Sequence, residues 1–199
     1  MMNNECVMSN FFEEKEKTKS ENFTIRIDPK VLGTIRSYAK SQRTTVNAAI
    51  NELLSQSVEW DITAARAGWL PIPKEIIIKI FERIPENELL ELGSKYGKKA
   101  TREILLTMRG KGDVDDMISI IRSRSKAANF HYSEIDEVEN LKLLIRHDMG
   151  AKFSKYLTAF YDESFKELQC QAEFDFTENT FSIMIDKKFF NISEQKKSA

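Results

Sequence analysis

The segment Asn22–Trp60, NFTIRIDPKVLGTIRSYAKSQRTTVNAAINELLSQSVEW, decides how this chain folds. It opens with a short stretch in which Phe23, Ile25 and Ile27 alternate with polar residues. Successive side chains point to opposite faces of a strand, so this period of two predicts a strand with one apolar face and one polar face.

Two amphipathic helices are predicted after this strand. Asp28 suits an N-cap and Pro29 suits the first position of a helix that ends near Ser41. Its apolar residues recur at spacings of three and four: Val31, Leu32, Ile35, Tyr38 and Ala39. A second helix starts after Thr44-Thr45, with apolar residues Ala48, Ala49, Ile50, Leu53, Leu54 and Val58. A core this small gives a single copy only marginal stability. We therefore expect a homodimer.

The alternating strand, the Asp28-Pro29 helix start, the tight turn and the TTVNAAI start of the second helix resemble the ribbon-helix-helix superfamily of DNA-binding repressors. MetJ and Arc belong to this superfamily, and the ungapped match covers Asn22–Trp60. The resemblance implies an intertwined homodimer whose two strands pair antiparallel and enter the major groove of double-stranded DNA as a ribbon.

The resemblance also implies which residues contact DNA. Asn22, Thr24 and Arg26 fall on the polar face of the strand and become the base-contacting residues. An arginine side chain can hydrogen-bond to guanine and an asparagine side chain to adenine. A threonine side chain can contact a thymine methyl group or a polar base edge.

Phosphate contacts are implied at the start of the second helix, at Thr45, Val46 and Asn47, where the helix dipole favours an anion. Arg43 stands where such turns often use a left-handed glycine. Five cations against three carboxylates give Asn22–Trp60 a net charge of +2, which predicts salt-sensitive DNA affinity. The alternative is that the segment is only a dimerisation clasp with ordinary solvated residues on its outer face.

The whole chain has 199 residues, a formal net charge of -1, 31% charged residues and 41% hydrophobic residues. This composition is typical of soluble globular proteins, and no apolar run is long enough to span a bilayer. The first residues do not resemble a signal peptide, so we expect a cytoplasmic location. Cys6 and Cys170 lack metal-ligand spacing, so neither a disulfide nor a metal or other cofactor is expected.

The predicted fold class is α+β. The expected parts are a flexible charged arm (1–21), the ribbon-helix-helix domain (22–67), a proline-containing linker (68–73), an α+β domain (74–190) and a tail (191–199). Trp69 and Leu70 are expected to pin the linker onto one of the two domains.

The α+β domain is predicted to begin with three helices: one over 74–84, one from Glu86 that is closed by Gly110-Lys111-Gly112, and one from Asp113 onward. Gly93 and Gly97, four residues apart in the second helix, suggest close packing against another helix. Three cations end the third helix: Arg122, Arg124 and Lys126. They suit a helix C-terminus, and the alternative is a second DNA-contacting patch.

The pattern then predicts β-β-α-β-β, with a four-stranded antiparallel sheet and a long helix over residues 149–169 on one face. Asp148 is expected to cap that helix. Arg146, His147 and Asp148 form a candidate ligand or sensor site at a strand end, because histidine titrates near neutral pH. The alternative is that His147 packs in the core beside Ile145.

These observations predict a sequence-specific DNA-binding transcriptional regulator, a repressor and a homodimer, with a tetramer left open. Its α+β domain either senses a small-molecule effector or extends the oligomer. A non-DNA interaction protein is the alternative function. An enzyme is not expected, because no nucleophile or paired carboxylate accompanies His147 in the sequence.

Overall fold

The computed structural model describes residues 21–109 and 112–190. The chain divides into two compact units, Met1–Val46 and Asn47–Ala199, and each is described by itself. The predicted tail and nearly all of the predicted arm lie outside the described residues. Among the helices of the described part, none combines the length and the apolar character that crossing a bilayer requires.

The first unit contains α1 (Pro29–Ser41), which starts and ends as the sequence predicts. The Asp28 carboxylate accepts the backbone N–H groups of Lys30 and Val31 at 2.8 and 3.3 Å, and Pro29 takes the first helical position. Arg43 after the helix is left-handed, with φ +53°, so an arginine occupies the conformation that glycine usually supplies.

Residues 21–28 have no regular secondary structure, so the predicted ribbon is not formed in the single chain. A strand is held by hydrogen bonds to a neighbouring strand, and the strands of the described residues all lie between 131 and 186.

The second unit starts with one continuous helical stretch in three parts: α2 (Val46–Gln56), the π-helical turn η1 (Ser57–Asp61) and α3 (Ile62–Arg66). Gly68 ends it at φ +80°. The boundary between the two compact units falls between Val46 and Asn47. The predicted linker at 68–73 thus belongs to the second unit.

Two tryptophans attach this stretch to the core of the second unit. The Trp60 and Trp69 rings lie edge to face, 5.4 Å apart between centroids, and pack beside buried Ala64. Trp69 thus pins the linker as predicted, whereas the same expectation for Leu70 was wrong, because its side chain is 77% exposed.

The next two helices are α4 (Lys74–Arg83) and α5 (Glu86–Arg109), separated by Pro85. Helix α6 (Val114–Ala127) follows, and Asp113 caps it by accepting the Asp116 backbone N–H at 2.9 Å. Its buried side chains belong to the same core as those of α7 (Ala151–Glu167) and the sheet.

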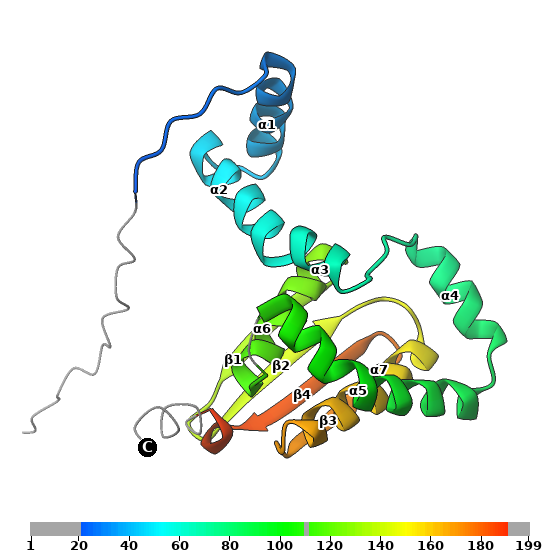
Figure 1. The fold of residues 1–199 in the computed structure, drawn as a ribbon. Coiled ribbons are helices and arrows are strands. Elements are labelled where there is room, and N and C mark those ends of the chain that lie inside the picture. The colour runs from blue at the N-terminus through cyan, green and yellow to red at the C-terminus, as the bar shows by residue number, and fades with distance from the viewer. Residues whose placement is uncertain (1–20, 110–111, 191–199) are drawn as a thin grey trace, which may run out of the picture. The chain divides into compact units, whose positions relative to one another are not determined.

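The four strands form one antiparallel sheet in the order β1-β2-β4-β3 (Figure 1), which confirms the predicted α+β class. The strands are β1 (His131–Asp136), β2 (Asn140–Arg146), β3 (Ala172–Phe176) and β4 (Thr180–Asp186), followed by the short 3-10 helix η2 (Lys187–Phe189). Leu143 pairs with Ile183 and Ile145 with Phe181, and all four are buried. This apolar face lies under α6 and α7.

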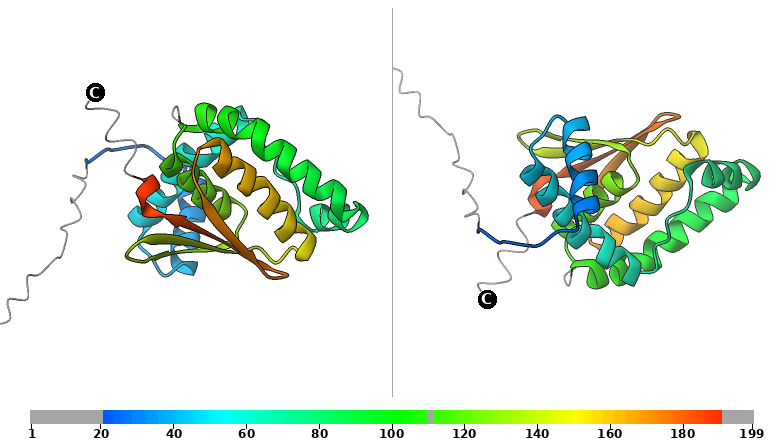
Figure 2. Two further views of the ribbon diagram at one scale, coloured as in Figure 1. Left: turned by 90° about the horizontal axis from the view of Figure 1, so that it is seen from below. Right: turned by 90° about the horizontal axis from the view of Figure 1, so that it is seen from above.

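Helix α5 lies side by side with α7, as Figure 2 shows from two directions. The expected close packing at Gly93 and Gly97 is confirmed. A Cβ on Gly93 would lie 2.9 Å from the Tyr156 carbonyl oxygen, and one on Gly97 would overlap the Phe160 carbonyl oxygen. Only glycine lets the two backbones approach this closely.

Gly97→Ala is therefore expected to destabilise the protein by roughly 1–3 kcal/mol, because the methyl group must push two helices apart. Urea unfolding measures the change. Gly33→Ala in α1 is the matched control, since no atom lies within 4 Å of its added Cβ. Equal effects of the two substitutions would contradict the packing account.

Candidate functional site

The predicted base-contacting residues Asn22, Thr24 and Arg26 are all exposed in the irregular segment before α1. Apolar Phe23 and Ile25 between them are 88% and 47% exposed. Two large apolar side chains of this segment are thus in contact with solvent in the single chain. Polar and apolar residues alternate in the segment; Phe23 and Ile25 are uncovered in the single chain, whereas Ile27 is partly buried.

The predicted phosphate-contacting residues Thr45, Val46 and Asn47 lie at the start of α2, which begins at Val46. Thr45 and Asn47 are exposed and Val46 is partly buried. The first backbone N–H groups of a helix point along its axis, so this end has the polarity that attracts an anion.

The described part of the first unit is basic. Residues 21–46 carry five cations and two carboxylates, which gives a net charge of +3. Every one of these charged side chains is exposed. These described residues therefore present a positively charged surface to solvent.

The three cations of α6 are all engaged within the protein. Arg122 bonds Glu134 at 2.8 Å through Nε, and the Arg124 guanidinium lies 4.8 Å from the Trp69 ring centroid. Lys126 pairs with Glu52 of α2 at 3.2 Å. This supports the structural interpretation of these cations over the second DNA patch.

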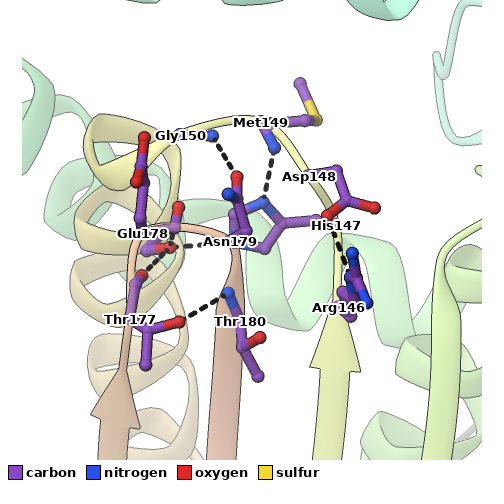
Figure 3. Close-up of polar contacts among 10 residues, drawn as sticks. Arg146, His147, Asp148, Met149, Gly150, Thr177, Glu178, Asn179 and Thr180 are labelled. Atoms are coloured by element: carbon purple, nitrogen blue, oxygen red, sulfur yellow. Dashed lines mark hydrogen bonds and ion pairs between the residues drawn. The ribbon is translucent and has the colours of Figure 1, made fainter.

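The Arg146–Asp148 turn differs from the prediction (Figure 3). The expectation that Asp148 caps α7 was wrong. The backbone of Asp148 is left-handed, with φ +53°, and its carboxylate instead accepts Arg146 Nε at 3.0 Å. The bond lowers the pKa of Asp148. Gly150, at φ +84°, takes the position before the helix, and its N–H donates to Asn179 Oδ1 at 3.1 Å.

His147 is fully buried and its ring nitrogens are both bonded. The Met149 N–H donates to Nδ1 at 3.0 Å, so Nε2 carries the proton and donates to Ser154 Oγ at 2.9 Å. Ser154 in turn donates to the Thr177 carbonyl at 2.8 Å. The Phe153 ring lies 5.0 Å from the imidazole. This arrangement supports the core alternative, because neither nitrogen is left to bind a ligand.

Burial lowers the pKa of His147 to about 4, with nearby Lys74 acting in the same direction. The imidazole is therefore neutral at physiological pH. Cys170 is buried as well, and burial raises its pKa to about 11, so its thiol stays protonated.

The described residues contain no group of three or more histidine, cysteine, aspartate or glutamate side chains placed to hold a metal ion. An open groove of about 310 Å³ lies between α5 and α7 near Leu90 and Phe176. A void of about 10 Å³ beside Trp69 is barely large enough for one water molecule.

Sequence reasoning missed Arg109, which joins three helical elements of the second unit. Its guanidinium donates to the Glu59 carbonyl of η1 at 2.9 Å and to the Ser119 and Ser123 hydroxyls of α6, each at 3.1 Å. The sequence shows only a cation in the last turn of a helix, so no signal indicates these distant partners.

No model of a known protein family matches the chain, and no curated protein matches it either.

The neutral, buried His147 predicts a pH-dependent stability. An unfolded histidine binds a proton near pH 6.5 but the folded one only near pH 4, so lowering the pH through this interval favours the unfolded state. The free energy of unfolding should fall by roughly 3 kcal/mol across it. Urea unfolding at successive pH values measures the loss.

The imidazole titration, followed by NMR, separates His147 from the carboxylates that titrate in the same range. A His131→Gln variant assigns the two signals, since the protein has two histidines. A His147 signal that titrates near pH 6.5 would contradict the buried, neutral state.

Proposed function

We propose that this protein is a sequence-specific DNA-binding transcriptional regulator, a repressor, which reads the major groove with a two-stranded ribbon contributed by a homodimer. The observation that carries the proposal is the unpaired segment 22–27. Phe23 and Ile25 are exposed in one copy, and the alternate positions carry Asn22, Thr24 and Arg26, whose side chains can bond base edges.

The dimer follows from the surface that one copy leaves uncovered. Among the described residues of the first unit, Phe23, Ile25 and Val31 are the large apolar residues that are exposed. In the second unit α2 and η1 add Leu53, Leu54 and Val58, of which Leu54 and Val58 are 55% and 64% exposed. A second copy that pairs its strand with this one would satisfy the strand hydrogen bonds and cover Phe23 and Ile25. The apolar side chains of α2 and η1 are a separate uncovered surface, in the second unit, that another copy could also cover.

The positions at which α1 and α2 begin, and the positive net charge of residues 21–46, support the same function. Asp28 caps α1, left-handed Arg43 turns the chain, and α2 begins at Val46, in the order that the ribbon-helix-helix resemblance requires. Thr45, Val46 and Asn47 would then bind a phosphate at the start of α2, and the net charge of +3 on residues 21–46 favours an anionic partner.

The α+β domain would extend the oligomer or sense a small effector, with a tetramer of paired dimers as one form. The buried state of His147 favours the oligomer over an effector bound at that residue. No catalytic role is proposed, and a cytoplasmic location accords with a DNA-binding regulator.

Arg26→Ala is expected to weaken binding to the preferred sequence by about 1–3 kcal/mol more than binding to random DNA, because it removes a base contact. Fluorescence anisotropy with the two duplexes measures the difference. Arg83→Ala, at an exposed arginine of α4, is the matched control and should leave both affinities unchanged. An equal loss on both duplexes after Arg26→Ala would show that the residue contacts only the backbone.

Leu54→Glu is expected to shift the protein from dimer to monomer, because it places a charge in the apolar surface that the second copy covers. Sedimentation velocity measures the change in mass. Leu106→Glu is the matched control, since Leu106 is also largely exposed but lies on α5. A dimer that survives Leu54→Glu would rule out this surface.

The alternative function, an interaction protein that uses the segment only as a clasp, gives a different result in the same pair of experiments. Leu54→Glu would still yield monomers, but the wild-type dimer would not bind DNA even at low salt.

A further inference from the structure

The outward face of α5 carries a compact group of cations that the proposed ribbon does not use. The eleven residues from Leu92 to Arg102 contain four cations and no carboxylate. The cations are Lys95, Lys98, Lys99 and Arg102. Their spacings of three and four place them on one face of the helix, within an arc of roughly 100°.

These side chains are exposed and mostly unengaged. All four are exposed, and within the described part of the chain no ion pair reaches Lys95, Lys98 or Lys99. Arg102 approaches Glu167 at 3.6 Å, with its side chain 75% exposed. The cations of α6 differ, because each of them has a partner inside the protein.

The helix that carries this group is held rigidly. Gly93 and Gly97 bring α5 against the backbone of α7, and Leu89 and Leu105 bury the inner face on either side of them. The Cα atoms of these residues therefore keep helical spacings, with about 10 Å along the axis from Lys95 to Arg102 at the rise of an α-helix. One strand of duplex DNA presents about three phosphates over that length.

A neighbouring aromatic side chain adds to the same surface. Tyr96 is 54% exposed and lies beside Lys95 and Lys99 on the helix. Its hydroxyl is a donor of the kind that contacts phosphate oxygens in protein–DNA complexes. Glu91 precedes the group and Glu103 follows it, so the basic surface is confined to about three turns.

We propose that this face of α5 is a second DNA-binding surface, which contacts the sugar–phosphate backbone of duplex DNA without reading its sequence. It deepens the proposed function, since it would add affinity to the base contacts of the ribbon. It explains why Lys95, Lys98 and Lys99 have no ion pair within the described residues while the cations of α6 each have a partner. An acidic protein surface is the competing partner, and the test separates the two.

The test compares the full-length Lys98→Gln, Lys99→Gln double variant with the wild type on a random-sequence duplex over a series of salt concentrations. Glutamine keeps the helix propensity and removes only the charge. The slope of log affinity against log salt should become shallower by about 2, and the affinity at low salt should fall about ten-fold. Circular dichroism and thermal unfolding check that the fold is unchanged.

The matched control is Lys79→Gln, Lys142→Gln, which removes two cations from α4 and β2. It should leave the slope unchanged. An unaltered slope in the α5 variant would overturn the proposal, and so would competition by polyglutamate as effective as that by unlabelled duplex.

Failure of this proposal and failure of the ribbon give distinguishable results. If the α5 surface is not used, the double variant binds like the wild type and Arg26→Ala still removes the sequence preference. If the ribbon does not read DNA, no sequence preference exists to be lost, while the double variant still changes the salt slope.

Discussion

The close approach of α5 to α7 is the constraint on which the second unit depends. Gly93 and Gly97 each cost about 1 kcal/mol relative to alanine in an isolated helix. They persist because only a residue without a Cβ lets α5 reach the carbonyls of Tyr156 and Phe160. Helix α7 in turn covers the apolar face of the sheet, so this contact fixes the order of the layers and the direction of the outer face of α5.

The π-helical turn η1 has a comparable role at the start of the unit. It joins α2 to α3 without a break, and the Arg109 guanidinium bonds both its Glu59 carbonyl and two hydroxyls of α6. Trp60 packs in the same core. A π-helical turn inside a helix often marks a functional position. In the proposed regulator, this stretch would connect the phosphate-binding start of α2 to the α+β domain without a flexible linker.

Much of the fold was predictable because its signals are local. The Asp28-Pro29 start, the Gly93 and Gly97 pair and the alternation in β2 each act within a few residues. The partners of Arg109 lie up to fifty residues away, and the unpaired lysines of α5 stand out only once other cations are seen to be engaged. Asp148 was misassigned as a cap because the sequence does not show that it pairs with Arg146. The predicted DNA contacts depend on a second copy, which one chain cannot supply.

In the proposed regulator, two copies form a ribbon that reads a DNA sequence. The most direct test is selection of bound fragments from the source genome by the purified protein, beside a Thr24→Ala, Arg26→Ala double variant. We expect the fragments recovered by the wild type to share a repeated motif, and the fragments recovered by the variant to lack it. Fragments with no common motif, from a protein shown to be dimeric, would contradict it.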